Sequence, residues 1–278
     1  MAISVFDLHS HSTRSDGLLS PAEVVERAAQ HGVHALALTD HDEVSGLPEA
    51  RAAAAAAGIR LIPGVEVSVS WHGHTLHIVG LAIDADNATL VEGLRKNRSG
   101  RDARAKRIAA QLESLGIAGT YEGARRYASN PELVSRAHFA RYLVERGHAK
   151  TTQGIFDRYL GAGKPAYVAH EWAELGEALA WIRTAGGLPV IAHPGRYKLD
   201  SIEQGALLDE FKALGGAALE VVTSAHTAEQ SVYWAKLATR HGLLASAGSD
   251  YHGPRESYRD IGDLPPLPGG CTPVWQEF

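Results

Sequence analysis

The sequence has little sulfur and no long apolar run. Cys271 is the only cysteine, so the chain cannot form an intrachain disulfide. No stretch approaches the ~18 uninterrupted apolar residues that span a membrane. Asp7 and His9 follow so soon after the first residue that no apolar signal-peptide segment fits before them. These absences exclude a disulfide-stapled or membrane-spanning class, and we expect a cytoplasmic protein without a membrane partner.

The composition is that of a globular protein whose charge is unevenly distributed. The 278 residues are 45% hydrophobic, enough for one large or two modest domains. The formal net charge of −5 argues against a phosphate-rich partner. However, residues 87–165 hold 15 Lys+Arg and 7 Asp+Glu, a net of +8, which leaves −13 for the rest of the chain. Acidic and basic chemistry therefore occupy different parts of one chain.

Strands and helices alternate along both outer parts of the chain. The capping box Ser20-Pro21-Ala22-Glu23 marks a helix start, with proline at the first helical position. We expect strands at 3–8, 35–39, 59–69, 76–83, 188–192, 218–222 and 243–246, and helices at 21–31, 47–57, 172–185, 202–214 and 228–241. Apolar strands that alternate with helices predict a parallel sheet covered by helices, either a barrel or an open α/β sheet.

The middle of the chain has a different pattern. Residues 87–115 and 131–146 show helical spacing without a convincing strand. We therefore expect an α/β domain made of residues 1–86 and 166–278, with a helical insertion at 87–165. A solvated helix face is the ordinary explanation of the basic residues in this insertion, and it stays open at this point.

Polar clusters follow the predicted strands. His9 and His11 are two residues apart, as are Asp250 and His252, so in an extended chain each pair points to one side. Active sites of α/β barrels gather at the carboxyl ends of their strands. Each cluster alone is weak evidence, but several buried imidazoles and carboxylates without partners would each cost about 1–3 kcal/mol. A metal centre would satisfy them together.

These clusters resemble the motifs of the polymerase and histidinol phosphatase (PHP) family. The matching segments are His9-x-His11, Ser15-Asp16-Gly17, Thr39-Asp40-His41, Gly64-x-Glu66, His77, Ala192-His193-Pro194 and Gly248-Ser249-Asp250-x-His252. The resemblance implies a distorted (βα)7 barrel that binds up to three divalent metals. It implies nine metal ligands: His9, His11, Asp16, His41, Glu66, His77, His193, Asp250 and His252. Because no ligand is substituted, an active enzyme is favoured over a non-catalytic PHP interaction module.

The ligand types point to particular metals. Mixed imidazole and carboxylate ligands without thiolate suit Mn²⁺, Zn²⁺ or Fe²⁺, and Mn²⁺ tolerates an oxygen-rich site best. We expect two or three such ions, with Glu66 and Asp250 as candidate bridges. Paired ions activate a water and clamp the oxygens of a phosphoryl displacement, although an amide-hydrolysing enzyme can use similar ligands. Asp40 and Asp42, which flank His41, are expected to support the site or cap a helix rather than to bind metal.

The insertion resembles that of one PHP branch, the 3',5'-nucleoside bisphosphate phosphatases, some of which also act as 5'-to-3' exonucleases on short RNA. Guanidinium groups bind phosphate through paired hydrogen bonds. The resemblance implies that the substrate side of the pocket is lined by Arg101, Arg104, Ser135, Arg136, His138 and Lys164, beside Asp16 and His41. We expect Trp172 to be a packing residue within a helix.

The hypothesis is a metal-dependent phosphatase that removes the 3'-phosphate of 3',5'-bisphosphonucleotides. Hydroxide generated at the metals would attack phosphorus, and His193, Asp16 or a metal-bound water would protonate the leaving oxygen. The alternatives are a 5'-to-3' exonuclease on short RNA oligonucleotides or another PHP phosphoesterase such as a histidinol-phosphate phosphatase. The expected partner is a small-molecule nucleotide substrate.

Overall fold

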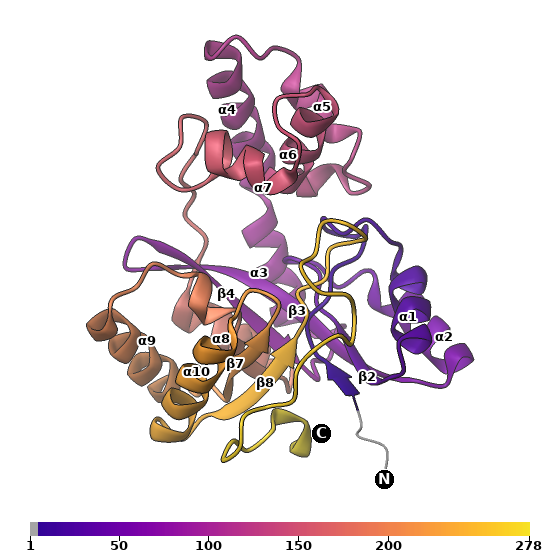
Figure 1. Cartoon of the computed structure of the whole chain (residues 1–278), viewed down its shortest axis with the longest axis vertical. Coiled ribbons are helices and arrows are strands. Elements are labelled where there is room, and N and C mark those ends of the chain that lie inside the picture. Colours follow the sequence, from indigo (N-terminus) through magenta and orange to yellow (C-terminus); the bar gives the residue numbers. More distant parts are fainter. Residues whose placement is uncertain (1–4) are drawn as a thin grey trace.

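A computed structural model describes residues 5–278, so the start of the strand expected at 3–8 lies outside the described residues. One sheet forms a nearly closed barrel in the order β1-β2-β3-β4-β6-β7-β8, and β5 pairs with β3 (Figure 1). The strands are β1 (Val5–Asp7), β2 (Val33–Leu38), β3 (Arg60–Trp71), β4 (His74–Leu81), β5 (Ala173–Glu174), β6 (Leu188–Ile191), β7 (Ala218–Thr223) and β8 (Leu244–Gly248). The Leu8 N–H donates to the Ala247 carbonyl at 2.9 Å, which brings the two ends of the sheet together.

The expectation of an all-parallel sheet is wrong for β4. This strand runs antiparallel to both β3 and β6, whereas the pairs β1·β2, β2·β3, β6·β7 and β7·β8 are parallel. His72 and Gly73 connect β3 to β4 with φ values of 45° and 82°, the left-handed conformation of a tight hairpin turn. Because side chains alternate identically in both strand directions, the apolar pattern of β4 did not reveal its orientation.

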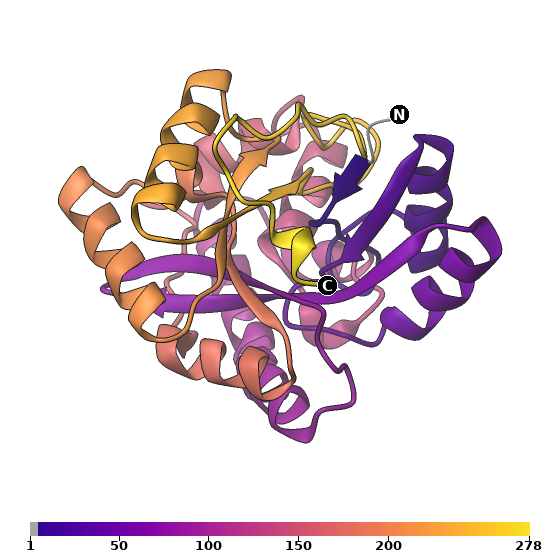
Figure 2. The ribbon, with the colours of Figure 1, turned by 90° about the horizontal axis from the view of Figure 1, so that it is seen from below.

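Helices cover the outside of the sheet (Figure 2). They are α1 (Pro21–Gln30), α2 (Leu47–Ala57), α8 (Leu175–Thr184), α9 (Ser201–Ala213) and α10 (Ala228–Arg240). The predicted capping box is present, with Ser20 and Glu23 bonding each other's backbone. The helix expected from residue 172 begins three residues later, because Ala173 and Glu174 pair with Val69 and Ser70 as β5. Trp172 therefore precedes this strand and lies outside the helix.

The middle of the chain is helical, as expected. Its elements are α3 (Ala88–Arg98), α4 (Arg101–Ser114), α5 (Thr120–Arg125), the 3₁₀ turn η1 (Pro131–Leu133), α6 (Arg136–Glu145), α7 (Thr152–Ile155) and the π-helical turn η2 (Phe156–Leu160). The segment expected to be helical from 87 to 115 is divided at Ser99 and Gly100. A side chain at Gly100 would collide with His170, since its Cβ would lie 2.3 Å from the imidazole Cε1. The return of the chain at residue 170 thus passes directly over the break.

Two apolar clusters distinguish the barrel from the helices above it. Leu90 and Leu94 of α3 belong to the large cluster around the barrel, and Gly93 packs against the ring of Trp181. A second cluster begins at Ala105 of α4 and includes Phe139 of α6. Figure 1 shows α4–α7 standing above the barrel, with α3 leading up to them. By packing, α3 is part of the barrel, while the division of the chain at residues 87 and 165 stays a prediction.

The last residues of the chain close the end of the barrel that lies away from α4–α7 (Figure 1). The 3₁₀ turn η4 (Val274–Gln276) lies across the bottom of the ring of strands in Figure 2. Val274 packs with barrel residues, and the Trp275 ring stacks on Phe6 with centroids 4.5 Å apart. Access to the interior is therefore from the carboxyl ends of the parallel strands, beneath α4–α7. None of the helices between residues 5 and 278 has the length and apolar character that a membrane crossing requires.

Candidate metal centre and substrate pocket

The first and last strands bring four polar side chains to the open end of the barrel. His9 and His11 follow β1, while Asp250 and His252 follow β8. The Asp250 N–H donates to the His9 carbonyl at 2.9 Å, so the two loops run side by side. Gly248 permits this approach, because a Cβ at that position would lie 2.3 Å from the His9 Cβ. The sheet thereby joins residues that are about 240 positions apart.

Glu66 of β3 is the centre of the cluster. Its carboxylate is fully buried and faces a ring of imidazole nitrogens. The distances from its oxygens are 2.8 Å to His41 Nδ1, 2.9 Å to His77 Nδ1, 3.1 Å to His193 Nε2, 3.3 Å to His11 Nε2 and 3.4 Å to His9 Nε2. This place among five imidazoles is compatible with the predicted bridging role of Glu66, which stays a prediction.

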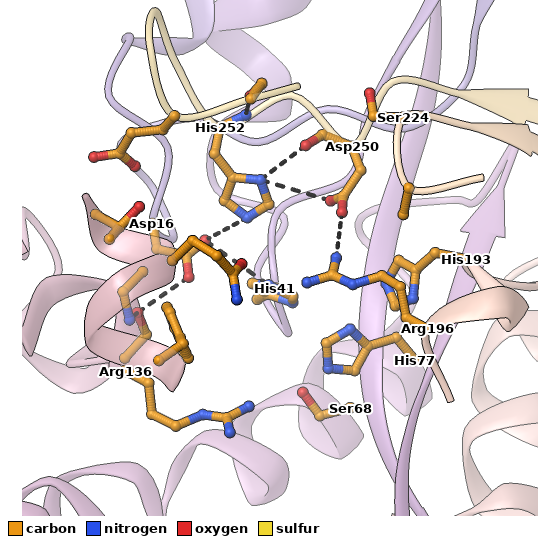
Figure 3. A pocket seen from close by; sticks show the side chains of 18 of the residues that line it. Asp16, His41, Ser68, His77, Arg136, His193, Arg196, Ser224, Asp250 and His252 are labelled. Carbon is orange, nitrogen blue, oxygen red and sulfur yellow. Dashed lines mark hydrogen bonds and ion pairs between the residues drawn. The ribbon is translucent and has the colours of Figure 1, made fainter. Parts of the chain in front are cut away.

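Two further carboxylates complete the cluster (Figure 3). Asp250 Oδ1 lies 3.3 Å from His11 Nε2 and 3.5 Å from His9 Nε2. Asp16 Oδ1 lies 3.4 Å from His252 Nε2 and 3.8 Å from His41 Nε2. The structure therefore brings all nine residues of the predicted ligand set to one end of the barrel.

The cluster holds an ionised carboxylate and several polar atoms without hydrogen-bond partners in the described part of the chain, which are the groups that a divalent cation needs as ligands. Burial acts to raise the pKa of Glu66, but the surrounding imidazoles outweigh it and hold that pKa well below its usual range. Several buried atoms among the described residues have no hydrogen-bond partner, including His11 Nδ1, Asp16 Oδ1 and His193 Nδ1. His41 Nδ1 and Glu66 Oε2 are close, yet neither is oriented to form a hydrogen bond. Buried polar atoms rarely lack partners, so this donor set fits bound cations.

Carboxylates outside the cluster hold the ligands in place. Glu220 of β7, which is 1% exposed, accepts from His9 Nδ1 at 2.7 Å and from the His193 N–H at 2.6 Å. Asp40 accepts from the Ser12 N–H at 2.7 Å and from the Ser15 hydroxyl at 2.6 Å. Glu220 was not among the residues predicted from the sequence. Its one available signal was a carboxylate inside the otherwise apolar strand Ala218–Thr223.

A cavity of about 860 Å³ lies between the cluster and the helices above it. From the barrel it is lined by Asp16, His41, His77, His193, Asp250 and His252, and from the helical segment by Arg101, Arg104, Ser135 and Arg136. Figure 3 shows Arg136 across the cavity from Asp250 and His193. The acidic and basic parts of the chain thus face each other across one space.

The basic wall contains two guanidinium groups without ion pairs among the described residues. Arg104 Nε donates to the Val168 carbonyl at 3.0 Å, and Arg136 contacts the Leu160 carbonyl at 3.5 Å. Burial, together with the neighbouring Arg136 and Arg101, lowers the pKa of Arg104 to about 9. Burial also lowers the pKa of Arg136. Positive charge that is buried without a carboxylate favours an anionic ligand.

The other predicted substrate residues take different positions. Ser135 caps α6 and donates its hydroxyl proton to Asp16 Oδ2 at 3.0 Å. His138 is buried behind the wall, where its Nδ1 accepts the Ser135 N–H at 3.1 Å. Lys164 is exposed and lies outside the residues that line the cavity. Ser135 thus borders the cavity, whereas the structure brings neither His138 nor Lys164 to its wall.

Arg196 and Trp172 are pocket residues that were not predicted as such. Arg196 Nη1 lies 2.7 Å from Asp250 Oδ2 and stands at the centre of the pocket in Figure 3. Its signal in the sequence was its place directly after His193-Pro194-Gly195. Trp172 was expected to pack within a helix, but it lies outside any helix and lines the cavity. The Arg101 and Arg104 guanidinium carbons are 4.5 and 5.4 Å from the centroid of its ring. Its buried ring therefore forms part of the basic wall.

An α/β barrel with imidazoles and carboxylates clustered at the carboxyl ends of its strands is typical of metal-dependent hydrolases. The family model described as "PHP domain" matches residues 7–227, and the chain belongs to the PHP family. The chain is an enzyme of this hydrolase class, and its clusters are of the kind that binds divalent metal ions.

Comparisons with individual proteins agree with this assignment. The chain is 51% identical over 272 residues to a 3',5'-nucleoside bisphosphate phosphatase of Chromobacterium violaceum, covering 98% of this chain and 95% of that protein. It is 42% identical to a 5'-3' exoribonuclease of Haemophilus influenzae, covering 98% of both chains. It also resembles the solved structure of a sulfate-bound, metal-free amidohydrolase from C. violaceum, with a TM-score of 0.96, 50% identity and coverage of 99% and 95%.

Proposed function

We propose that this protein hydrolyses the 3'-phosphate of 3',5'-bisphosphonucleotides, such as adenosine 3',5'-bisphosphate, to a nucleoside 5'-monophosphate and phosphate. The observation that carries the proposal is the pair of guanidinium groups, Arg104 and Arg136, that have no ion pair within residues 5–278 and face the ligand cluster across one cavity. A substrate with two phosphates places one at each wall. The phosphatase relative from C. violaceum supports the same assignment.

The nine clustered residues would hold two or three divalent ions. Three sets of ligand atoms lie within 4.8 Å of one another: His11, Asp16, His41 and His252; His9, His11 and Asp250; and His41, Glu66 and His77. We propose Mn²⁺, because the sets mix imidazoles with carboxylates and contain no thiolate. When bound, such ions polarise a phosphoryl oxygen and activate a water.

The residues of the chain itself bind and orient the substrate. Arg104 and Arg136 would bind the 5'-phosphate through charge-assisted hydrogen bonds. Arg196, 2.7 Å from Asp250, would donate to the 3'-phosphoryl oxygens beside the cluster. His193 and Asp16, which line the cavity, are the two side chains proposed to pass a proton from a water to the leaving 3'-oxygen, and the one that does so would not be a metal ligand at that step.

Replacing Arg136 with alanine tests the recognition of the second phosphate. We expect Arg136→Ala to weaken use of the bisphosphate by about 1.5–3 kcal/mol, or roughly 10- to 150-fold in kcat/KM. The rate with a nucleoside 3'-monophosphate should change far less. Arg126→Ala is the matched control, since Arg126 is exposed and pairs with Glu145 on the outer surface. Equal losses for both substrates would contradict this role of Arg136.

A second candidate activity is stepwise hydrolysis of short RNA from its 5' end. The relative from H. influenzae favours it, and so does Tyr258, which is 79% exposed where it lines the cavity. An exposed aromatic ring offers a surface on which a base can stack. The test is to incubate short 5'-phosphorylated RNA and the bisphosphate with the same enzyme. Release of mononucleotides from RNA supports this second activity.

A further inference from the structure

Asp42 is a buried carboxylate that stands beside the ligand cluster but faces away from it. The residue follows His41, is 0% exposed and has a φ of 50°. A non-glycine residue in this left-handed region is strained, so its surroundings must hold it there. Its backbone N–H donates to the Glu66 carbonyl at 2.8 Å, which ties it to β3, the strand that carries Glu66.

The side chain of Asp42 binds the helices of the basic wall. Its Oδ1 accepts from Asn97 Nδ2 at 2.9 Å, and its Oδ2 forms a buried ion pair with Arg101 Nη2. Its carbonyl oxygen accepts from Arg98 Nη1 at 2.6 Å. The Ser68 N–H donates to the same Oδ1 at 2.9 Å. One residue therefore connects the loop of His41 and strand β3 to both α3 and α4.

Arg101 links Asp42 to two residues that line the cavity, Ser68 and Trp172. Its Nη2 also contacts the Ser68 hydroxyl at 3.1 Å, and its guanidinium lies 4.5 Å from the centroid of Trp172. The Trp172 N–H in turn donates to Ser70 Oγ at 2.9 Å. Arg101 is thus held on two sides, unlike Arg104 one turn later, which has no ion pair among the described residues and stacks on the same ring at 5.4 Å.

The chain crosses between the barrel and the upper helices close to this point. One crossing is the break at Ser99 and Gly100, and the other is the return through His170 to Trp172. Short non-helical crossings of this kind act as hinges unless other contacts restrain them. Asp42 contacts Asn97 and Arg98 before the first crossing and Arg101 after it, so it restrains the angle at which α4 leaves the barrel.

We propose that Asp42 is a positioning residue that acts through Arg101 to fix the basic wall at a set distance from the metal cluster. This distance selects substrates by the spacing of their two phosphates. The proposal rests on the proposed function for its consequence in selectivity, while the mechanical claim stands on the contacts alone. It assigns Arg101 to holding the wall, and leaves Arg104 and Arg136 to bind the phosphate.

The test is a double-mutant cycle of Asp42→Asn and Arg101→Gln, measured as kcat and KM with a 3',5'-bisphosphate and with a nucleoside 3'-monophosphate. For Asp42→Asn we expect a tenfold or greater rise in KM for the bisphosphate, with metal content and monophosphate kinetics within twofold of wild type. The double variant should be no worse than either single variant. Asp102→Asn is the control, because Asp102 forms an exposed pair with Lys106 on the same helix.

Several results would overturn the proposal. Additive losses would mean that Arg101 binds phosphate directly, and equal losses on both substrates, or loss of metal, would mean that Asp42 supports the fold or the metal ligands instead. If Asp42→Asn does not fold, Ser68→Ala removes the second partner of the Arg101 guanidinium and should raise the same KM by a smaller factor.

Hydrogen–deuterium exchange of the intact enzyme separates this inference from the proposed function. Asp42→Asn should speed exchange at residues 97–104 and 168–173, with no change in α1 and α2. If the wild-type enzyme showed no preference for bisphosphates, the proposed function would fail, and the exchange experiment would still decide the positioning role. Unchanged exchange in both segments contradicts that role.

Discussion

Glu220→Gln tests how the protein holds two of its predicted metal ligands. The Glu220 carboxylate accepts from His9 Nδ1 at 2.7 Å with one oxygen and from the His193 N–H at 2.6 Å with the other. His193 has a φ of 29°, an unfavourable conformation that this second bond helps to maintain. Glutamine preserves the size of the side chain but carries one acceptor oxygen in place of two.

The magnitude follows from that change. Whichever way the amide turns, its NH₂ group faces either the ring N–H of His9 or the backbone N–H of His193, and two donors cannot bond each other. One charge-assisted hydrogen bond is therefore lost. Such a bond contributes about 1.5–3 kcal/mol, which corresponds to roughly 10- to 150-fold in metal affinity. We expect the loss in affinity because His9 would no longer be oriented towards Glu66 and Asp250.

The measurement is the dissociation constant for Mn²⁺, obtained by competition with a chelating indicator, together with the thermal unfolding of the metal-free protein. Glu229→Gln is the control, since Glu229 is an exposed carboxylate on α10, directly after the same strand. A dissociation constant within twofold of wild type, in a folded Glu220→Gln protein, would refute the reasoning.

Further predictions concern the ligands, the buried histidine and the close approach of Gly248 to His9. His9→Ala and Asp250→Ala should each abolish phosphate release and lower the bound metal measured by mass spectrometry; unchanged metal and rate would refute their assignment as ligands. Burial lowers the pKa of His138 to about 4, so its imidazole binds a proton more readily in the unfolded chain than in the folded one. The free energy of unfolding should therefore fall as pH drops from about 6.5 towards 4, by about 3 kcal/mol in total. His138→Gln keeps an acceptor for the Ser135 N–H, and its unfolding free energy in urea should therefore depend less on pH over that range; an identical dependence would contradict this. Gly248→Ala would place a Cβ 2.3 Å from the His9 Cβ, and we expect a loss of about 1–3 kcal/mol in stability by the same urea titration. Wild-type stability of this variant would contradict the prediction, because it would show that the segments at Gly248 and His9 can move apart without cost.

Local signals were sufficient for much of the fold. Helix α2 was predicted at its observed bounds, Leu47–Ala57, because an alanine-rich run ends at Gly58. In the structure Gly58 ends the helix with a φ of 72°. The break at Gly100 was missed, since it depends on the imidazole of His170, which is distant in sequence. The direction of β4 was missed for the same reason: pairing partners are set by the whole sheet.

The candidate site shows the same division between local and tertiary information. His9 and His11, or Asp250 and His252, are recognisable because strand geometry and the PHP motifs place them in pairs. The position of Trp172 beneath two arginines could not be inferred, because it depends on how the returning chain meets α4. The assignment of the nine residues as metal ligands stays a prediction until metal is measured.

The most direct test of the central claim is the hydrolysis of adenosine 3',5'-bisphosphate in the presence of Mn²⁺, with the products separated by chromatography. The same assay with adenosine 3'-monophosphate and adenosine 5'-monophosphate gives the preference. We predict the 5'-monophosphate as the nucleotide product, and a higher kcat/KM for the bisphosphate than for either monophosphate. Formation of the 3'-monophosphate, or equal use of bisphosphate and monophosphates, would contradict the account.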